Sequence, residues 1–464
     1  MHDKPTFGAE GSQTLLHPIV LIAMLIALPL LLLLPRRYAV IPFLLIAFLV
    51  PLQQEVMIGG FRIFVSRIMI VAGWFRIIQW KISSRGPVLA GGFNTLDKLF
   101  LFWAGFRAIA QILFYLQMAA VINQVSFFWD ALGGYFLLRF LIRDEKDIEL
   151  VIKTFAFVVV VLGACMLRER ITNENVFDIL GGLRQIKEFR NGHIRSQGPF
   201  QHEILAGTFG ATLIPLFLWL WKGRKSKLAA VGGVLGSTVM TITAGASTAV
   251  SAYAAGIMAL FFWPLRKKMR QLRWGIVIAL CCLQVVMKAP VWFLINHIDL
   301  VGGSSSYHRA ELIDQFLRHF WSWWLLGTNT ATEWGWDMWD AANQYVAEGE
   351  VGGLATLICF IAMICVAFRW LGNARKQSAG NGQKQWYIWF LGATLFSHVV
   401  AFFGVSYFDQ TRISWLALLA IISAAVAPAV MARARAKLRV QQNLPEDPKP
   451  EVLPALTPFN VEFL

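Results

Sequence analysis

The strongest constraint on the fold of this chain is a series of long apolar segments that follow one another through most of its 464 residues. About thirteen segments are long enough to cross a bilayer, since a spanning helix needs roughly 20 apolar residues. They lie at 18–35, 38–54, 56–80, 98–119, 122–142, 148–167, 203–221, 228–243, 247–265, 274–296, 345–368, 386–404 and 412–432. Because open strands and irregular backbone cannot face lipid, each segment is expected to be a helix. The sequence predicts an all-α, polytopic membrane protein with about 12–13 transmembrane helices.

Composition agrees with this class. Hydrophobic residues make up 57% of the chain and charged residues 15%, whereas soluble proteins average about 45–50% and about 25%. These values exclude a cytosolic enzyme, a disulfide-stapled secreted domain and a disordered chain. The five cysteines fall inside apolar runs without the paired spacing of a zinc or redox site, so we interpret them as core residues.

The excess of positive charge is interpreted as a topology signal. Lys and Arg number 42 against 27 Asp and Glu, a net charge of +15, which in a soluble protein would raise the question of nucleic acid. Here the basic residues fall in short loops on one side of the alternating segments, and the positive-inside rule makes that side the cytoplasm. The clusters are Arg36 and Arg37; Lys81 and Arg85; Lys222, Arg224, Lys225 and Lys227; Arg266, Lys267, Lys268, Arg270 and Arg273; Arg369, Arg375, Lys376 and Lys384; and Arg433, Arg435, Lys437 and Arg439.

This topology predicts one membrane domain over residues 1–432, with the N-terminus outside and no nucleic-acid partner. The Pro-rich residues 433–464 are expected to form a disordered cytoplasmic tail. Two outer loops, at about 168–202 and 297–344, are much longer than the other connections. Function is therefore sought on the outer face.

The first outer loop carries cations on the side where the positive-inside rule disfavours them. They are Arg184, Lys187, Arg190 and Arg195. Such a cluster suggests an anionic ligand, and the planar fork of arginine suits phosphate. Gly198 and Pro199 break the chain just before a helix expected to begin near Gln201, and a helix N-terminus favours an anion. We interpret the loop as a diphosphate site, with Arg184 and Arg190 as substrate-binding residues.

The alternative for these arginines is a structural role. They could bind lipid head groups or the acids Glu188 and Glu203 of the same region. Such pairing would leave the loop without a ligand of its own.

The second outer loop begins with an amphipathic pattern. Apolar residues recur with the helical period over residues 307–324, namely Leu312, Ile313, Phe316, Leu317 and Phe320. The helix is expected to lie along the outer membrane surface. Arg309, Asp314 and Arg318 would face water or the first loop, and Arg309 is either a second phosphate clamp or a solvated charge.

A tryptophan-rich stretch follows, with Trp334, Trp336 and Trp339 among Glu333, Asp337 and Asp340. Flat indole faces beside carboxylates suit a sugar, although interfacial tryptophans more often anchor a protein in the bilayer. One of the acids could act as a general base toward a sugar hydroxyl.

Asn343, Tyr345 and Glu348 stand where this loop meets the next apolar segment. Because an acid near the membrane is costly, Glu348 and Glu350 invite a functional interpretation. We predict Glu348 as a candidate catalytic residue, and Asn343 and Tyr345 as substrate-binding residues.

Charges within the spans form a further set, composed of Arg62, Arg67, Arg107, Asp130 and Arg139. Charges at depth face a water-filled cavity or one another. Arg67 is therefore a substrate-binding candidate, and a structural pair such as Arg107 with Asp130 is the alternative. No phosphate-binding Walker loop, His-rich metal cluster or Ser-His-Asp arrangement is evident in the sequence.

Four runs resemble, in order, motifs of the bacterial O-antigen ligase and polymerase superfamily. The family's Arg-x-x-Gly-x-Phe motif resembles RSQGPFQHEILAGTFGATLIPL, and its second periplasmic arginine with the helix after it looks like YHRAELIDQFLRHFWSWWLLGTN. Its His-Asn-x-Tyr-Leu and Glu-x-Gly-x-x-Gly-Leu stretch is similar to ANQYVAEGEVGGLATL, and its last spans are similar to VSYFDQTRISWLALLAII. The resemblance covers about residues 60–430.

The resemblance implies a GT-C-like glycosyltransferase of the bacterial inner membrane. It would take a glycan from undecaprenyl diphosphate at the periplasmic face and join it to a lipid-linked glycan, as a polymerase, or to a lipid core, as a ligase. No metal, nucleotide or other cofactor is implied. The family's arginines correspond to Arg195 and Arg309, which would stabilise the diphosphate leaving group.

One departure from the family concerns the proton acceptor. The family's ligase histidine falls on Ala342, and alanine cannot accept a proton. His308, Asp340 or Glu348 would then take that role, and the departure favours a polymerase over a ligase.

Two other classes of function stay open. A transporter or flippase would use Arg67, Arg107 and Asp130 as a path and the outer loops as a gate. A catalytically inactive scaffold is consistent with Ala342. The charge gathered in two outer loops favours the transferase.

Overall fold

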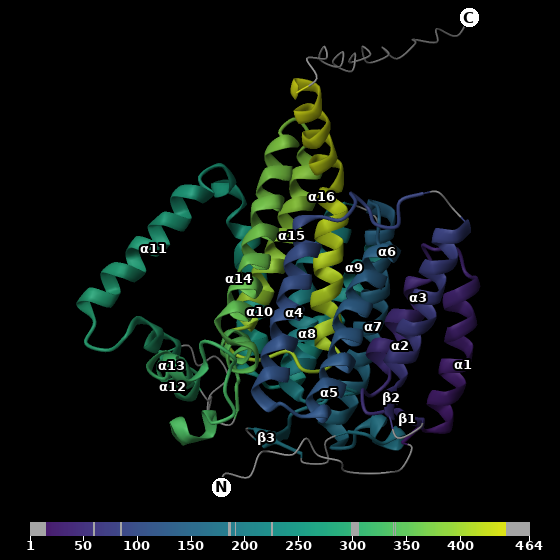
Figure 1. The fold of residues 1–464 in the computed structure, drawn as a ribbon, viewed down its shortest axis with the longest axis horizontal. Coiled ribbons are helices and arrows are strands. Elements are labelled where there is room, and N and C mark those ends of the chain that lie inside the picture. The colour runs from purple at the N-terminus through teal and green to yellow at the C-terminus, as the bar shows by residue number, and fades with distance from the viewer. Residues whose placement is uncertain are drawn as a thin grey trace, which may run out of the picture.

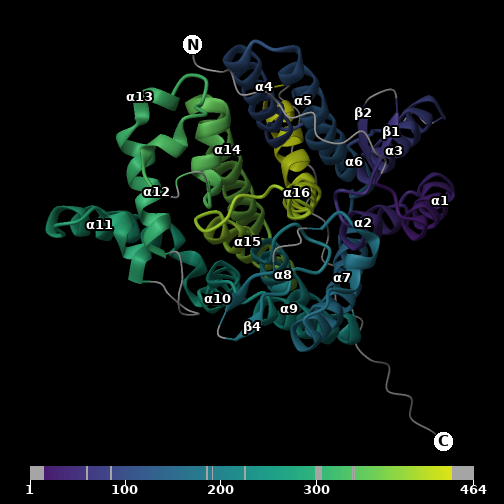
Figure 2. The same ribbon diagram turned by 90° about the horizontal axis from the view of Figure 1, so that it is seen from below.

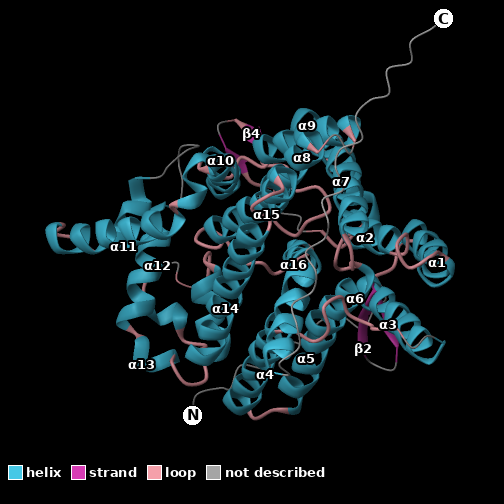
Figure 3. Ribbon diagram, turned by 90° about the horizontal axis from the view of Figure 1, so that it is seen from above, coloured by secondary structure: helices cyan, strands magenta, loops and turns pink. Residues whose placement is uncertain are grey.

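The computed structural model describes residues 15–58, 61–83, 86–183, 187–190, 192–223, 226–297, 306–336, 338 and 340–441. Arg184, Asp337 and Trp339 lie outside the described residues, as do the side chain of Arg62 and residues 442–464 of the predicted tail. The described chain is helical apart from two short hairpins (Figures 1 and 3). This is the all-α architecture that the apolar segments predict.

The first half of the chain contains α1 (Pro18–Leu33), α2 (Val40–Leu49), β1 (Glu55–Ile58), β2 (Phe61–Phe64), α3 (Val65–Ser83), α4 (Thr95–Tyr115), α5 (Met118–Phe128), the π-helical turn η1 (Trp129–Gly133), α6 (Gly134–Leu141), α7 (Glu145–Thr172), the 3₁₀ turn η2 (Val176–Leu180), β3 (Phe189–Arg190), β4 (His193–Ile194) and α8 (Glu203–Lys222). The second half contains α9 (Lys227–Thr243), α10 (Ser247–Phe261), η3 (Trp263–Lys267), α11 (Met269–Val286), η4 (Val291–His297), α12 (Ser306–Arg318), α13 (Phe320–Trp323), η5 (Ala331–Trp334), α14 (Gln344–Gln377), α15 (Gly382–Ala401) and α16 (Thr411–Gln441).

Within the described residues, six helices are long and apolar enough to cross a membrane: α4, α7, α8, α11, α14 and, over Thr411–Val430, α16. Four shorter apolar helices of 10–17 residues accompany them, namely α1, α2, α9 and α10. Length and composition thus give the helices of a membrane protein. The number of 12–13 transmembrane helices stays a prediction.

The region 38–80 departs from the prediction of two helices. Helix α2 ends at Leu49, and an antiparallel hairpin follows in which Glu55 pairs with Phe64 and Ile58 with Phe61. Helix α3 begins only at Val65. The physical reason is visible in the sequence MIGGFRI, because a Gly-Gly pair between two short apolar runs is a turn signal for a hairpin.

The predicted helix 122–142 is also interrupted. It consists of α5, the π-turn η1 and α6. A π-turn adds a residue to one turn of the helix and so rotates the next turns about the helix axis. Asp130 lies on this turn, and Ala131 of the same turn lines the pocket described below.

The helices pack closely where small residues meet. A side-chain carbon on Gly236 of α9 would lie 2.5 Å from the backbone oxygen of Val159 on α7, and one on Gly163 would lie 3.0 Å from the oxygen of Gly236. Small residues allow such backbone contact between helices in a membrane. Helix α11 is different, because none of its residues is buried and it stands away from the other helices (Figure 1).

The bundle has two distinct ends. The hairpins β1–β2 and β3–β4 and the short helices α12 and α13 gather at one end, at the bottom of Figure 1, and we call this the loop end. Helix α16 runs from the loop end to the opposite end. The two long loops predicted on one face therefore lie at the same end of the molecule.

A buried ion pair lies near the start of α4, toward the opposite end. Arg139 of α6 contacts both carboxylate oxygens of Asp97 at 3.0 and 3.1 Å, and neither side chain has any exposed surface. The Tyr135 hydroxyl donates to the same carboxylate at 2.7 Å. Arg139, one of the predicted intramembrane charges, thus holds α4 against α6.

Candidate functional site

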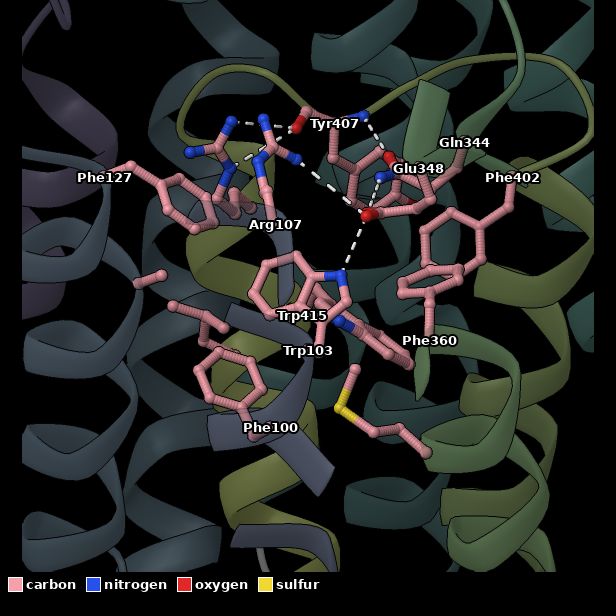
Figure 4. A pocket seen from close by; sticks show the side chains of 14 residues that line it. Phe100, Trp103, Arg107, Phe127, Gln344, Glu348, Phe360, Phe402, Tyr407 and Trp415 are labelled. Carbon is pink, nitrogen blue, oxygen red and sulfur yellow. Dashed lines mark hydrogen bonds and ion pairs between the residues drawn. The ribbon is translucent and has the colours of Figure 1, made fainter. Parts of the chain in front are cut away.

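Helices α4, α5, α14 and α16 lie near one another in the bundle (Figure 2). A pocket lies between them, in the half of the bundle nearer the loop end (Figure 4). The space in it that a water-sized sphere can reach is about 30 Å³, and the pocket is partly open to solvent. The walls are largely aromatic, and the polar groups are an acid, an amide, a phenol and two guanidinium groups. The lining residues are Phe100, Trp103, Arg107, Phe127, Ala131, Gln344, Glu348, Phe360, Met363, Phe402, Tyr407, Arg412, Trp415 and Leu416.

Glu348, a predicted catalytic residue, is the acid of this pocket and is buried. Trp103 Nε1 donates to its Oε2 at 2.8 Å, and Gln344 Nε2 donates to its Oε1 at 2.6 Å. Arg107 Nη1 lies 3.9 Å from Oε2. The carboxylate is therefore held by two neutral donors, with a guanidinium just beyond hydrogen-bond distance (Figure 4).

Arg107 and Arg412 place two positive charges beside this single acid. The Arg107 guanidinium lies over the ring of Phe127 at 4.4 Å, and that of Arg412 lies 6.0 Å from the same ring. Arg412 also donates to the backbone carbonyl of Tyr407, from Nη2 at 3.3 Å and from Nε at 3.4 Å. The two arginines are close enough for mutual repulsion. The pocket thus carries more positive than negative charge.

The start of α14 explains why Glu348 lies where it does. Asn343 caps this helix, since its Oδ1 accepts from the backbone N–H groups of Tyr345 at 2.9 Å and Val346 at 3.2 Å. Gln344 then accepts from the Tyr407 N–H at 2.6 Å and donates to Glu348 one turn later. Tyr345 points elsewhere, with its hydroxyl 3.3 Å from the Val399 carbonyl. Asn343 thus caps the N-terminus of α14, and the Tyr345 hydroxyl contacts α15.

A kink in α14 joins this helix to the second outer loop. Gly353 has φ +69° and ψ −171°, which breaks the helical hydrogen bonding. The Leu354 N–H donates instead to the Trp324 carbonyl at 2.8 Å, and the Glu350 carbonyl accepts from the Thr328 N–H at 2.7 Å. Gln111 of α4 donates to the Val351 carbonyl at 2.6 Å. The kink thereby fixes the loop against the helix that carries Glu348.

The first outer loop gathers charge around Arg195. Its Nη1 lies 2.5 Å from Glu188 Oε2 and 2.7 Å from Glu203 Oε1, and its Nε donates to the Ala244 carbonyl at 3.3 Å. His202 Nδ1 lies 3.3 Å from Glu203 Oε2. Glu188, His202 and Glu203 are close enough to share a metal ion, but the Arg195 cation already occupies the two acids. Arg195 therefore pairs with Glu188 and Glu203, which is the structural alternative considered from the sequence.

Arg190 of the same loop serves a helix terminus. Its Nη1 donates to the Gly245 carbonyl at 3.0 Å, just after α9 ends. Arg170 Nη1 reaches the Thr243 carbonyl at 3.4 Å. Arginines at a helix C-terminus complement its unpaired carbonyls and negative dipole end. Arg190 thus stabilises the α9–α10 turn. Arg184, the other predicted substrate-binding arginine of this loop, lies outside the described residues.

The second outer loop forms the expected helix as α12 and α13, but two of its charges are not solvated. Arg309 and Asp314 are buried, so neither faces water, which was one of the two predicted environments. The reason for Asp314 is its bonding, since Arg318 Nε lies 2.5 Å from its Oδ2 and Trp292 Nε1 donates to Oδ1 at 3.3 Å. His308 Nε2 lies 3.2 Å from the Asp340 carbonyl. Two predicted catalytic residues, His308 and Asp340, are therefore neighbours.

The tryptophans divide into a buried and an exposed group. Trp334 packs in a small core with Phe316 and stacks on the His319 ring at 5.2 Å, so its indole is not an open surface. Trp336 is 92% exposed. A sugar-binding role among the described tryptophans of this stretch therefore falls to Trp336.

The intramembrane charges pair differently from the example drawn from the sequence. Arg67 Nε and Nη2 each donate to a different oxygen of Asp130 at 2.8 Å. Arg107 instead faces Glu348. The suggested pairing of Arg107 with Asp130 is therefore wrong. The sequence of single helices cannot locate a partner across the bundle.

Several residues of the site carry little signal in the sequence. Arg412 and Tyr407 adjoin the last span, where a single charge and a tyrosine are typical interfacial anchors. Gln344 stands between Asn343 and Tyr345, which both match the family motif. A search for polar side chains one helical turn from Glu348 would find Gln344.

The loop between α15 and α16 connects the pocket with the first outer loop. Asp409 Oδ2 accepts from the Gln201 N–H at 3.2 Å and Oδ1 accepts from the Thr411 N–H at 2.9 Å. Gln410 Nε2 donates to the Pro199 carbonyl at 2.9 Å. Burial raises the pKa of the Asp409 carboxyl to about 6. Arg412 of the pocket and the loop that bears Arg195 are thus tied through one short segment.

Comparison of the chain with protein-family models, with curated proteins and with solved structures gave no match. The function is therefore inferred from the residues and geometry of the site.

Proposed function

We propose that this chain is a membrane glycosyltransferase of the O-antigen ligase and polymerase type, with a GT-C-like fold in the bacterial inner membrane. It moves a glycan from an undecaprenyl-diphosphate-linked donor to a hydroxyl of a glycan or lipid-core acceptor. The loop end faces the periplasm in this proposal. No metal or other cofactor takes part.

The observation that carries the proposal is the buried Glu348 carboxylate in a pocket near the loop end. The acceptor hydroxyl gives its proton to this carboxylate as its oxygen bonds to the anomeric carbon of the donor sugar. The bond between that carbon and the diphosphate oxygen breaks, and the lipid diphosphate leaves. A positioned base of this kind contributes about 10²- to 10⁴-fold to a rate. Glu348 thus takes the role that Ala342 cannot fill.

Arg195 and Arg309 stabilise the leaving diphosphate in this scheme. Of the two acids that hold Arg195, Glu188 is 34% exposed and Glu203 only 3%. An arriving phosphate therefore displaces Glu188 more easily, while Glu203 keeps the guanidinium in place. His308 and Asp340, at the first turn of α12 and the approach to α14, contact the acceptor sugar with Trp336.

The test is glycan transfer by the purified full-length chain in detergent, with EDTA, from an undecaprenyl-diphosphate-linked repeat unit. We expect Arg195→Ala and Arg309→Ala each to lower kcat by about 10²- to 10³-fold, since losing one donor to a developing anion has that effect. Glu348→Gln removes the base and should lower kcat by about 10²- to 10⁴-fold. Product size separates a polymer ladder from single attachment.

An exposed arginine provides the matched control. Arg168 lies at the end of α7 in a pair with Glu174 in which both side chains are exposed. Arg168→Ala should keep wild-type activity. Full activity in Arg195→Ala and Arg309→Ala would contradict the proposed roles, and lipid translocation without any transfer would favour a flippase instead.

A further inference from the structure

The pocket brings two guanidinium groups close together. Glu348 is the acid of its lining, and both of its oxygens already accept hydrogen bonds from Trp103 and Gln344. Beside the pocket, the Asp409 carboxylate interacts with Arg412. A charge at this depth in a membrane protein is costly unless it is paired. Arg412 has the Asp409 carboxylate nearby, whereas Arg107 lies 3.9 Å from Glu348, so Arg107 is the group that attracts an anion.

The hydrogen-bonding capacity of Arg107 is also incompletely used. Its Nη1 is 3.9 Å from Glu348, longer than a hydrogen bond. Its buried Nε has no hydrogen-bond partner among the described residues. A buried donor without an acceptor destabilises a protein, so such a group signals a missing partner.

The chemistry of the walls narrows the ligand. A phosphate offers several acceptor oxygens and up to two negative charges, which suits two arginines better than a single carboxylate would. Around the charges stand the rings of Trp103, Phe127 and Trp415 (Figure 4). Aromatic surfaces bury apolar carbon well. The pocket therefore combines a phosphate-binding group with a wall for a hydrocarbon chain.

We propose that Arg107 and Arg412 form a binding site for the phosphate group of an isoprenoid lipid, in the pocket between α4, α5, α14 and α16. This site is separate from the Arg195 cluster of the first outer loop. Only the identity of the lipid rests on the proposed function, because phosphate binding does not require glycan transfer. Glu348 competes with the phosphate for Arg107.

The first test measures binding to the purified full-length chain in detergent with three probes: farnesyl phosphate, farnesol and inorganic phosphate. Farnesyl phosphate should bind at least tenfold more tightly than either of the others. Arg107→Gln and Arg412→Gln should each weaken it by about 10- to 100-fold, the range for hydrogen bonds to charged groups. Equal binding of farnesol would overturn the phosphate site, and equal binding of inorganic phosphate would overturn the isoprenoid part.

The second test uses the competition with Glu348. Glu348→Gln removes the negative charge and should tighten farnesyl phosphate binding several-fold, whereas a purely structural role predicts weaker binding. Arg412→Lys keeps the charge and should retain most of the affinity, so it replaces Arg412→Gln if that variant does not fold. The exposed Arg168, which pairs with the exposed Glu174, is the control, and Arg168→Gln should match the wild type. Weaker binding in Glu348→Gln would overturn the proposal.

The two proposals fail in different ways. Farnesyl phosphate binding that depends on Arg107, in a chain that transfers no glycan, supports the pocket and contradicts the proposed function. Transfer that depends on Arg309, with farnesyl phosphate binding unaffected by Arg107→Gln, contradicts the pocket alone.

Discussion

Replacing Gly353 by alanine tests whether the kink of α14 holds the second outer loop. At this residue φ is +69° and ψ is −171°, a region that is essentially restricted to glycine. A side-chain carbon would also lie 2.5 Å from the Leu325 carbonyl oxygen and 2.9 Å from that of Trp324. The Leu354–Trp324 and Glu350–Thr328 backbone bonds would then have to move apart.

The magnitude comes from these two effects. The backbone strain costs about 1–3 kcal/mol, and forcing a methyl group into filled space costs about 1–3 kcal/mol more. The free energy of unfolding should therefore fall by about 2–6 kcal/mol. At about 2 cal/mol/K of unfolding entropy per residue, a chain of 464 residues loses roughly 1 °C of Tm per kcal/mol, so Tm should fall by about 2–6 °C.

The assay is thermal unfolding of the purified chain in detergent, beside a control in the same helix. Gly372 also lies in α14, and a side-chain carbon there would meet no atom within 4 Å. Gly372→Ala should be neutral or stabilise the helix by up to about 1 kcal/mol. Equal Tm values for the two variants would refute the role assigned to the kink.

Three further predictions concern the buried charges and the tryptophans. Arg139→Met leaves the Asp97 carboxylate buried without a countercharge, and should destabilise the chain by about 3–5 kcal/mol, whereas adding Asp97→Asn should recover part of this loss in a thermal-unfolding cycle; strict additivity would argue against the pair. The pKa of Asp409 is raised from 3.8 to about 6. The protonated carboxyl therefore adds roughly 3 kcal/mol to the free energy of unfolding below pH about 4, and this contribution is lost as the pH rises through about 6. Thermal scans across this range should show the loss in the wild type and little of it in Asp409→Asn; identical pH profiles would contradict the assignment. Trp334→Ala should destabilise by about 3–5 kcal/mol because its indole is buried, while Trp336→Ala should leave Tm unchanged and weaken acceptor binding, seen as a higher KM; a lower Tm in Trp336→Ala would show that this indole is packed.

The long helices can be predicted from the sequence because hydrophobicity alone decides them. The segments 148–167, 203–221 and 345–368 appear as α7, α8 and α14 with ends that differ by a few residues, or by nine at the end of α14. The hairpin after α2 escapes prediction because six of the eight residues in its two strands are apolar. Only the Gly-Gly pair between them distinguishes a turn from a continuing helix.

The candidate site is predictable in part. Glu348 and Arg107 can be singled out because charges at depth are expensive, but their contact joins α4 to α14 and depends on how the helices pack. The same limit explains why the sequence suggests Asp130 as the partner of Arg107. Arg412 shows no unusual local pattern, and its role appears only once α16 lies beside α4.

The arginines of the first outer loop show the same limit of prediction from sequence. A basic cluster in an outer loop predicts an anion, and Glu188 and Glu203 supply negative charge to Arg195 within the protein itself. Arg190 meets backbone carbonyls after α9. Sequence spacing gives the charge of a loop, while the three-dimensional contacts decide which charges are already satisfied.

The central claim is tested most directly by counting the lipid diphosphate released for each glycosidic bond formed. The purified wild-type chain is incubated with an undecaprenyl-diphosphate-linked glycan and its acceptor, and both products are measured by mass spectrometry. A transferase releases one undecaprenyl diphosphate per bond, and Glu348→Gln should lower both yields together. A donor that stays intact, or that only changes leaflet in proteoliposomes, would contradict glycan transfer.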